Sequence, residues 1–279
     1  MRLQLARLTL AYGDRVALRE LSVTLEGRII SLLGANASGK TSLLKILAGL
    51  APPTDGRALV DGEEVRPGQR PGISYLPQET GFFPFGQHPR ETLSGAFLLR
   101  GIKNYDPREF LAALGLEEED RSADEFSGGM KQKLRIAQAL VHAPRLLLLD
   151  EPTTGLDVRE RLRILRMIEH LRDRVSVVFS THHPEDAAAV ADNLLILHRG
   201  RAVAAGKPGE IRAIAHDRVF EVSVSSLTLP VDPDYEIVRV DRDNGTLALR
   251  VVGNPPPGAI TVPPRLEDAY VLLTRTTPF

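Results

Sequence analysis

The segment that most constrains the fold is a strand, a glycine-rich loop and a helix that follow one another directly. Residues 28–33 (RIISLL) are apolar without strict alternation, which predicts a central parallel strand covered on both faces. Gly34 to Ser42 (GANASGKTS) comes next, and the apolar residues of 43–50 then recur at helical spacing. A chain with this segment is expected to fold as an α/β protein around a parallel sheet.

The loop fits the pattern G-x-x-x-x-G-K-[ST], in which backbone N–H groups surround a β-phosphate and the next helix directs its positive end at the anion. Lys40 is expected to bridge the β- and γ-phosphates, and the Thr41 hydroxyl to ligate Mg²⁺. The predicted nucleotide-binding residues are Gly34, Ala35, Asn36, Ala37, Ser38, Gly39, Lys40, Thr41 and Ser42. The alternative is a turn that only caps a helix, and the strand before the loop and the helix after it weigh against that alternative.

Two acids follow a second buried strand, residues 146–149, which is four leucines. Parallel sheets bind ligands at the carboxyl ends of their strands, and successive strand residues point in opposite directions. We therefore expect Asp150 to hold Mg²⁺ through its water shell and Glu151 to polarise the attacking water. The alternative is that the two acids merely end a strand and cap the next helix, and the phosphate loop argues against it.

A third feature, Ser127-Gly128-Gly129, stands before an amphipathic helix whose inward residues are expected to be Met130, Leu134, Ala137 and Leu140. Ser127 is a sound N-cap, and two glycines allow backbone N–H groups to approach an anion closely. This turn is a second potential phosphate site, although alone it would more often be only a loop and a cap.

The rest of the chain fits one large domain with a small appendage. Short strands are predicted within residues 2–25 and at 58–60, 73–76 and 175–180, with a mostly helical stretch at about 90–143. A helix before 175–180 is expected to turn Leu162, Leu165, Ile168 and Leu171 to one side, which completes a βαβ unit. The expected fold is α/β, a P-loop NTPase with a mostly parallel central sheet, an N-terminal antiparallel β-subdomain and an inserted helical subdomain at about 80–145.

A boundary is predicted at residues 206–209 (GKPG), which gives an ATPase domain over 1–208 and a small α+β appendage over 209–279. In the appendage, residues 219–224, 237–240 and 247–252 are expected to be strands, with a hairpin turn at Asp243-Asn244-Gly245 and a closing helix over 266–273.

Composition excludes several classes of protein. The 279 residues are 43% hydrophobic and 25% charged, as in ordinary globular proteins, so disorder is not expected. The chain has no cysteine, which excludes disulfides and cysteine-based sites and suits a reducing cytosol. A formal net charge of -1 gives no general attraction to nucleic acid, and no direct nucleic-acid partner is expected. There is no signal-like N-terminus and no apolar run near the roughly 20 residues that span a bilayer, so we expect the chain alone to be soluble.

Six motifs occur in a fixed order: the phosphate loop, Gln78, residues 127–132 (SGGMKQ), 149–152 (LDEP), 155–157 (GLD) and 180–182 (STH). In this order residues 1 to about 210 resemble the nucleotide-binding subunit of an ABC transporter. The resemblance implies that Tyr12 stacks on adenine, that Gln78 contacts Mg²⁺ and the lytic water, and that His182 contacts the γ-phosphate. It also implies that Lys40, Gln78, Glu151 and His182 act in catalysis and that Thr41, Gln78 and Asp150 serve the metal.

The same resemblance implies a homodimer in which two copies enclose two ATP molecules. Ser127, Gly128 and Gly129 would reach the ATP of the second copy, and Asp157 would lie across the interface. The implied cofactors are ATP and Mg²⁺, and the implied partner is an integral membrane permease. The chain would then be cytoplasmic, and peripheral on the inner face of the cell membrane.

Simpler interpretations stay open for some of these residues. Tyr12 could be an ordinary turn residue, although stacking on a base is worth roughly 1 to 3 kcal/mol and tolerates other purines. Gln78 could be a surface amide, and His183 could take the role given to His182. Phe82, Phe83 and Phe85 could form a groove for a permease helix or fill the core of the helical subdomain.

Details of the motifs favour an export-type subunit with a separate permease. Residues 126–130 read FSGGM instead of the commoner LSGGQ, and residues 75–79 (YLPQE) and 266–270 (LEDAY) are similar to the same group. Ala37 departs from the glycine that many members carry there. The alternatives are the ATPase subunit of an importer, a soluble ABC ATPase that acts on nucleic acid or ribosomes, and a regulatory binder without catalysis. Glu151 and His182 argue against the last of these.

Overall fold

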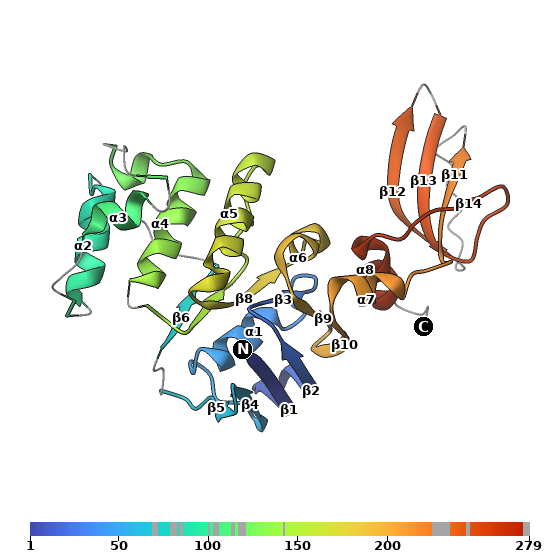
Figure 1. Cartoon of the computed structure of the whole chain (residues 1–279). Coiled ribbons are helices and arrows are strands. Elements are labelled where there is room, and N and C mark those ends of the chain that lie inside the picture. Colours follow the sequence, from blue (N-terminus) through green and yellow to red (C-terminus); the bar gives the residue numbers. More distant parts are fainter. Residues whose placement is uncertain are drawn as a thin grey trace.

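The computed structural model describes residues 1–68, 72–78, 83, 86–99, 101–102, 106–112, 115–116, 121–141, 143–224, 235–243 and 246–275. Figure 1 shows three parts: a central body with two sheets, a helical subdomain around α2 to α4, and an appendage at the C-terminal end. The expected α/β architecture with an inserted helical subdomain is confirmed.

The central sheet has six strands in the order β10-β9-β3-β8-β7-β6. They are β3 (Ile29–Leu33), β6 (Ile73–Leu76), β7 (Leu146–Leu149), β8 (Ser176–Thr181), β9 (Asn193–His198) and β10 (Arg201–Gly206). All neighbouring pairs are parallel except β9 with β10. Every residue of β3, β7 and β8 is buried, because helices and the second sheet cover both faces, and this burial explains their unbroken apolar sequences.

The second sheet is antiparallel, in the order β2-β1-β4-β5. Its strands are β1 (Arg2–Tyr12), β2 (Arg15–Glu26), β4 (Asp55–Val60) and β5 (Glu63–Glu64). β1 and β2 form one long hairpin rather than the short strands predicted, and Tyr12 pairs with Arg15 across its tip. The alternation was loose because the pairing register shifts at bulges, where Arg7 and Glu20 have positive φ.

The helices cover this body and build the subdomain. They are α1 (Lys40–Leu47), α2 (Pro89–Leu99), α3 (Pro107–Ala112), α4 (Gly128–Leu140), α5 (Val158–His170), α6 (Pro184–Val190), α7 (Pro208–Ala213) and α8 (Leu266–Thr274), with the 3-10 turns η1 (Ala123–Glu125) and η2 (Leu171–Asp173). Among the described residues, none of the helices has both the length and the apolar character needed to cross a bilayer.

The predicted inward face of α5 needs correction at one residue. Leu162 was expected to face the core, but it is 50% exposed, and α5 buries Ile164, Leu165 and Ile168 instead. Those three positions share one face of the helix, and Leu162 lies about a third of a turn away from the centre of that face. The inward face predicted for α4 is confirmed: Leu134 and Ala137 are fully buried, and Met130 and Leu140 are partly buried and pack against hydrophobic clusters.

The aromatic cluster can be judged at one residue. Phe83 packs against the core of the helical subdomain, and the Arg135 guanidinium lies 5.4 Å from its ring centroid. Phe83 therefore packs on the subdomain core while it stays partly exposed, and the proposal of a permease groove remains untested. Phe82 and Phe85 lie outside the described residues.

The appendage is an antiparallel sheet in the order β12-β13-β11-β14, closed by α8 (Figure 1). Its strands are β11 (Val219–Val224), β12 (Tyr235–Asp243), β13 (Thr246–Gly253) and β14 (Ile260–Thr261), which confirms the predicted strands and closing helix. Asp243 pairs with Thr246, as a hairpin requires, whereas Asn244 and Gly245 lie outside the described residues.

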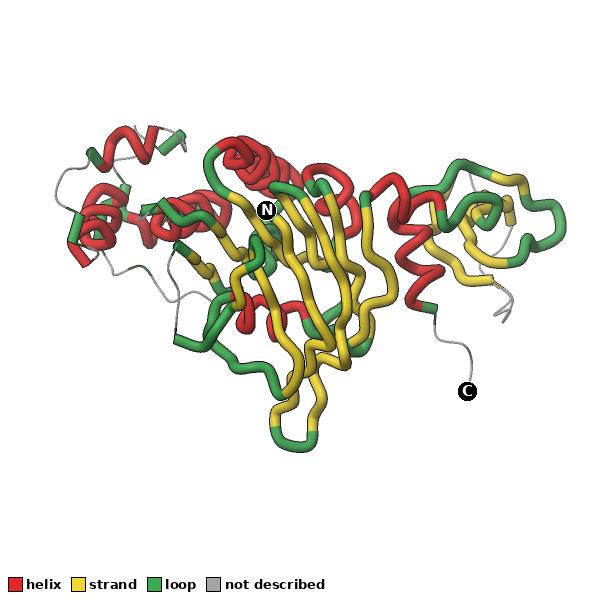
Figure 2. Tube along the Cα trace, turned by 60° about the horizontal axis from the view of Figure 1, so that its bottom comes forward, coloured by secondary structure: helices red, strands yellow, loops and turns green. Residues whose placement is uncertain are grey.

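A shared hydrophobic cluster joins the appendage to the central body. It includes Leu33 at the end of β3 and Ala187 of α6, together with Val252, Leu266 and Ala269 of the appendage. Figure 2 shows α7 and α8 beside the edge of the central sheet. The division at residue 208 therefore stays a prediction about organisation, since one core runs through it.

A buried ion pair fixes α8 to its sheet. Arg250 donates to both carboxylate oxygens of Asp268 at 2.9 and 2.7 Å, and to Glu221 at 3.1 Å. Asp268 is fully buried and Arg250 is 5% exposed. The Glu221 and Asp268 carboxylates also raise the pKa of Arg250.

We expect Arg250→Ala to lower the free energy of unfolding by about 3–5 kcal/mol, because it leaves the Asp268 carboxylate buried without its partner. Chemical denaturation monitored by circular dichroism measures this loss. The double variant Arg250→Met/Asp268→Leu removes both charges and should recover much of the stability. Equal losses in the single and double variants would show that shape, and not the unpaired charge, determines the effect.

Candidate phosphate-binding and hydrolytic site

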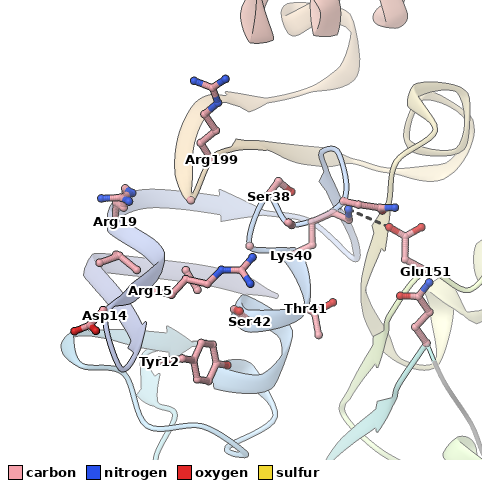
Figure 3. Close-up of a pocket in the computed structure, with 17 residues that line it drawn as sticks. Tyr12, Asp14, Arg15, Arg19, Ser38, Lys40, Thr41, Ser42, Glu151 and Arg199 are labelled. Atoms are coloured by element: carbon pink, nitrogen blue, oxygen red, sulfur yellow. Dashed lines mark ion pairs between the residues drawn. The ribbon is translucent and has the colours of Figure 1, made fainter. Parts of the chain in front are cut away.

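The phosphate loop joins β3 to α1, as the sequence predicted, and its backbone is held closely (Figure 3). Gly39 has φ +110° and lies against Ala17 and Leu18 of β2, where a Cβ would come within 2.7 Å of the Leu18 side chain. Gly34 is enclosed as tightly, because a Cβ there would meet the Leu197 carbonyl at 2.4 Å. Both glycines are therefore required by the fold around the loop.

Ala37 adopts the backbone conformation of the glycine that many members of the family that this chain resembles carry at this position. Its φ is +62°, in the left-handed region that alanine adopts at a cost of roughly 1–2 kcal/mol. The loop keeps the conformation that glycine would favour, so the substitution adds backbone strain without changing the path of the loop.

Lys40 is buried at the start of α1 and is bound on three sides. Its ammonium donates to the carbonyls of Gly34 at 2.6 Å and Ala35 at 3.1 Å, and it lies 3.0 Å from Oε1 of Glu151. The two side chains are 6% and 4% exposed. Burial alone would raise the pKa of Glu151, but Lys40, His182 and Thr154 outweigh it and hold that pKa below its ordinary value. The carboxylate is therefore ionised.

Glu151 has an unusual backbone conformation. Its φ is +50°, and such strain in a residue other than glycine is found where the surrounding structure enforces it, often at functional sites. Its N–H donates to the Ser180 hydroxyl at 2.8 Å, and that hydroxyl donates to Asp150 at 2.6 Å. Ser180 thus ties the two acids together at the carboxyl ends of β7 and β8.

Asp150 and Glu151 have different side-chain partners. Asp150 accepts hydrogen bonds from Ser180 and, at 3.2 Å, from the Tyr75 hydroxyl. Burial and the Asp150 carboxylate together raise the pKa of Tyr75, which therefore stays a neutral donor.

His182, and not His183, contacts the acid. Its Nδ1 lies 2.8 Å from Oε2 of Glu151, which also accepts a hydrogen bond from Thr154 at 2.9 Å. His183 lies against the His182 ring, with centroids 4.0 Å apart, and its backbone N–H donates to Thr181. Burial and the neighbouring His182 lower the pKa of His183.

One cavity of about 860 Å³ brings many of the predicted residues together (Figure 3). Tyr12, the loop from Asn36 to Ser42, Gln78 and Glu151 all line it, and Tyr12 is 49% exposed at one end. The cavity also contains residues that the sequence reasoning did not select, among them Arg15, Arg19 and Arg199. Asp150 and His182 do not line the cavity, and His182 is linked to it through its contact with Glu151.

The turn before α4 lies outside this cavity and holds a carboxylate from its own chain. Ser127 donates through its hydroxyl to Oε1 of Glu160 at 2.6 Å, and Gly129 donates through its N–H to Oε2 at 3.0 Å. Asp157 caps α5 by accepting the N–H of Glu160 at 2.9 Å. A Cβ on Gly129 would come within 2.7 Å of Glu160. Ser127 also caps α4 by accepting the Met130 N–H, as expected, and the phosphate site predicted here stays a prediction.

The donor set fits Mg²⁺ only together with a nucleotide. Within the described part of the chain, no cluster of three or more His, Cys, Asp or Glu side chains could hold a metal. Thr41 and Gln78 offer neutral oxygens beside Lys40, and Mg²⁺ in such sites takes most of its ligands from phosphate and water.

Several contacts were beyond sequence reasoning. Ser180 and Tyr75 belong to quoted motifs but received no role, and Glu160 was not considered. The only available signal for Ser180 was its place at the end of a buried strand next to that of Asp150. Nothing in the sequence indicates that Glu160 reaches Ser127, because the two are brought together only by the packing of α4 on α5.

Comparison with known proteins gives a consistent result. The sequence model of a family described as "ABC transporter" matches residues 18–154. A spermidine/putrescine import ATP-binding protein of Protochlamydia amoebophila is 36% identical over 209 residues, which cover 72% of this chain and 56% of that protein. An uncharacterized ABC transporter ATP-binding protein of Bacillus subtilis is 36% identical, with 80% and 76% covered. A Fe(3+) ions import ATP-binding protein of Rhizobium meliloti is 33% identical, with 93% and 79% covered.

Solved structures agree in fold. An ATP-binding cassette of an ABC transporter in its ADP conformation superposes with a TM-score of 0.68 at 22% identity, covering 78% of this chain and 96% of that one. A dimeric cassette in a post-hydrolysis state with ADP and Pi gives a TM-score of 0.62 at 24% identity, with 74% and 98% covered. At these identities the likeness establishes the fold alone.

We expect Ser180→Ala to lower the free energy of unfolding by about 1–3 kcal/mol, because it leaves the buried Glu151 N–H without a partner and the Asp150 carboxylate with only the Tyr75 hydroxyl as a side-chain donor. Ser31 of β3 is the matched control, since its buried hydroxyl has no hydrogen-bond partner among the described residues. Ser31→Ala should therefore be neutral or slightly stabilising. Equilibrium denaturation of both variants measures the difference, and equal effects would contradict the bridging role.

Proposed function

The chain belongs to the family of ABC transporter ATP-binding proteins, whose members are ATPases, and from that membership we propose that it hydrolyses MgATP to drive an integral membrane permease. The observation that carries the proposal is the single cavity in which Tyr12, the phosphate loop, Gln78 and Glu151 meet. Adenine would stack on Tyr12, the phosphates would lie on the loop, and the acid would face the γ-phosphate end.

The buried Lys40–Glu151 pair gives the site a defined first step. An ATP triphosphate competes with Glu151 for the Lys40 ammonium, so nucleotide binding frees the carboxylate. Glu151 can then accept a hydrogen bond from water and hold it for in-line attack, while His182, on the other carboxylate oxygen, keeps the acid oriented. Bound Mg²⁺, held by Thr41, Gln78 and water on Asp150, would neutralise phosphate charge.

The second half of each site is proposed to come from another copy of the chain. Ser127, Gly128 and Gly129 do not line the cavity of their own chain, yet Ser127 and Gly129 bind a carboxylate there with two donors. A two-fold dimer would place this turn over the partner's γ-phosphate, with Asp157 at the interface. Hydrolysis would remove that phosphate bridge and let the copies separate.

For the direction of transport, import is the better supported proposal. The sequence motifs favoured export, but the relatives with a named substrate are import proteins. The match to the iron import protein covers 93% of the chain, so it extends well beyond residue 208 into the appendage. The alternative of a soluble ATPase acting on nucleic acid has no support among these relatives.

Two partners and a location follow from this proposal. The chain would lie on the inner face of the cell membrane, held there by its permease, and an import system would add a substrate-binding protein. Affinity purification of the tagged chain from solubilised membranes tests this. Recovery of a permease with a substrate-binding protein would support import, and recovery of a permease whose ATPase responds only to inner-face substrate would support export.

We expect Glu151→Gln to keep ATP binding and to slow hydrolysis at least 10²-fold, because the amide cannot accept the proton of the attacking water. Phosphate release and nucleotide affinity, measured on the same preparation, separate the two effects. Hydrolysis at close to the wild-type rate would remove Glu151 from its proposed role.

We expect Glu160→Gln, in the Glu151→Gln background, to dimerise at several-fold lower ATP concentration, because the carboxylate on the Ser127 turn occupies the place of the partner's γ-phosphate and repels it. Size-exclusion chromatography with light scattering measures dimerisation over an ATP series. Glu169→Gln, on the same helix but paired with Arg172, is the control. An unchanged ATP requirement would mean that Glu160 only links α4 to α5.

A further inference from the structure

Three arginines line the ATP cavity without belonging to any of its predicted motifs. Arg15 and Arg19 come from β2 and Arg199 from the turn between β9 and β10. Figure 3 shows them on the side of the cavity opposite Glu151, with the Arg15 guanidinium directed toward Ser42 and Tyr12 below it. They form a basic rim, defined here as Arg15, Arg19 and Arg199, around the mouth of the site.

The basic rim carries the uncompensated charge of the cavity. Lys40 is neutralised by Glu151 at 3.0 Å. In the part of the chain that the structure describes, no carboxylate forms an ion pair with any of the three arginines, although Asp14 lines the same cavity. All three side chains are exposed. Arginines left unpaired around a concave site are suited to a phosphate-bearing ligand, to which the planar guanidinium donates in pairs.

The rim is fixed relative to the phosphate loop by backbone contacts. Arg199 and Gly200 form a two-residue hairpin turn, both with positive φ, between His198 and Arg201, which pair. The Gly200 N–H donates to the Ser38 carbonyl at 3.0 Å, and the Arg19 N–H donates to the Gly200 carbonyl at 2.8 Å. One chain of hydrogen bonds thus links the loop, the Arg199 turn and β2 at Arg19.

The place of Arg15 determines which part of a nucleotide it can reach. Arg15 pairs with Tyr12 across the tip of the β1–β2 hairpin, so its side chain starts beside the proposed adenine platform. It then extends toward Ser42 at the far end of the phosphate loop (Figure 3). Between a base on Tyr12 and β- and γ-phosphates on the loop lie only the ribose and the α-phosphate.

We propose that Arg15 binds the α-phosphate of the nucleotide, and that Arg19 and Arg199 attract the polyphosphate to the mouth of the cavity without contacting it directly. The proposal rests on the proposed function. It adds a contact that is the same for ATP and ADP, because both carry the α-phosphate. Arg15 is thus a binding residue for every adenine nucleotide that carries an α-phosphate, whereas Lys40 distinguishes nucleotides by their terminal phosphates.

Equilibrium binding of ATP and ADP to the whole chain, measured by calorimetry with Mg²⁺ present, tests the role of Arg15. Arg15→Ala should weaken both nucleotides by a similar factor of about ten, the effect of losing one hydrogen bond to a charged group at an exposed site. Arg15→Lys should recover part of the loss. Lys40→Ala is the comparison, with a larger loss for ATP than for ADP, and Arg212→Ala, an exposed arginine on α7, is the control for charge alone.

The outcomes separate the hypotheses. Unchanged affinity in Arg15→Ala, or a loss clearly greater for ATP than for ADP, would overturn the α-phosphate contact. An equal loss in Arg212→Ala would reduce the effect to net charge and overturn it as well. If the wild-type chain bound neither nucleotide, the proposed function itself would fail. That outcome is separate from the Arg15 test, because it is measured on the wild-type chain alone.

Stopped-flow association of a fluorescent ATP analogue tests the other two arginines. The double variant Arg19→Ala/Arg199→Ala should slow association several-fold at low salt and flatten its dependence on ionic strength, with the dissociation rate unchanged, because distant charges act on the encounter. Faster dissociation with unchanged association would instead show direct contact and contradict the assigned role.

Discussion

The ion pair between Lys40 and Glu151 is the interaction on which the rest of the site depends. Neither charge could stay in this interior alone, since an unpaired buried charge is far more costly than a paired one. The pair therefore joins the start of α1 to the end of β7, and it fixes the phosphate loop against the acid before any ligand arrives. In the proposed function the nucleotide takes the place of Glu151 beside Lys40, so nucleotide binding and release of the Glu151 carboxylate would be the same event.

Buried strands and the phosphate loop could be predicted from the sequence, whereas the exact inward face of α5 and long-range side-chain contacts could not. The strands around Leu33 and Leu149 were predictable because both faces of a parallel sheet are covered, and the loop because few backbones can follow a phosphate. Leu162 was wrongly predicted to face the core, because residues spaced three apart drift around a helix that repeats every 3.6 residues. The packing partner determines which of them are buried. Ser180 gave only the signal of its place at the end of a buried strand, because its contact with Asp150 forms only when β7 and β8 pair. Arg19 and Arg199 gave no signal, because the fold alone brings the Arg199 turn against β2.

The two anion-binding features of the chain are kept apart by its architecture. The phosphate loop opens on the central sheet, whereas the Ser127 turn belongs to the helical subdomain and is satisfied by Glu160. Under the proposed function, one molecule would bind a nucleotide at the phosphate loop, and the Ser127 turn of a second copy would complete the site.

The hydrophobic cluster that contains Leu33, Leu266 and Ala269 makes the phosphate loop depend on the appendage. Leu33 is the last residue before the loop, so the appendage supplies part of the floor on which the loop rests. A chain cut after α7 would lose the side chains that pack on Leu33, and the hydrophobic cluster beneath its phosphate loop would be exposed to solvent. A ligand or partner that shifted the appendage would therefore displace Leu33 and the neighbouring Gly34 through direct side-chain packing.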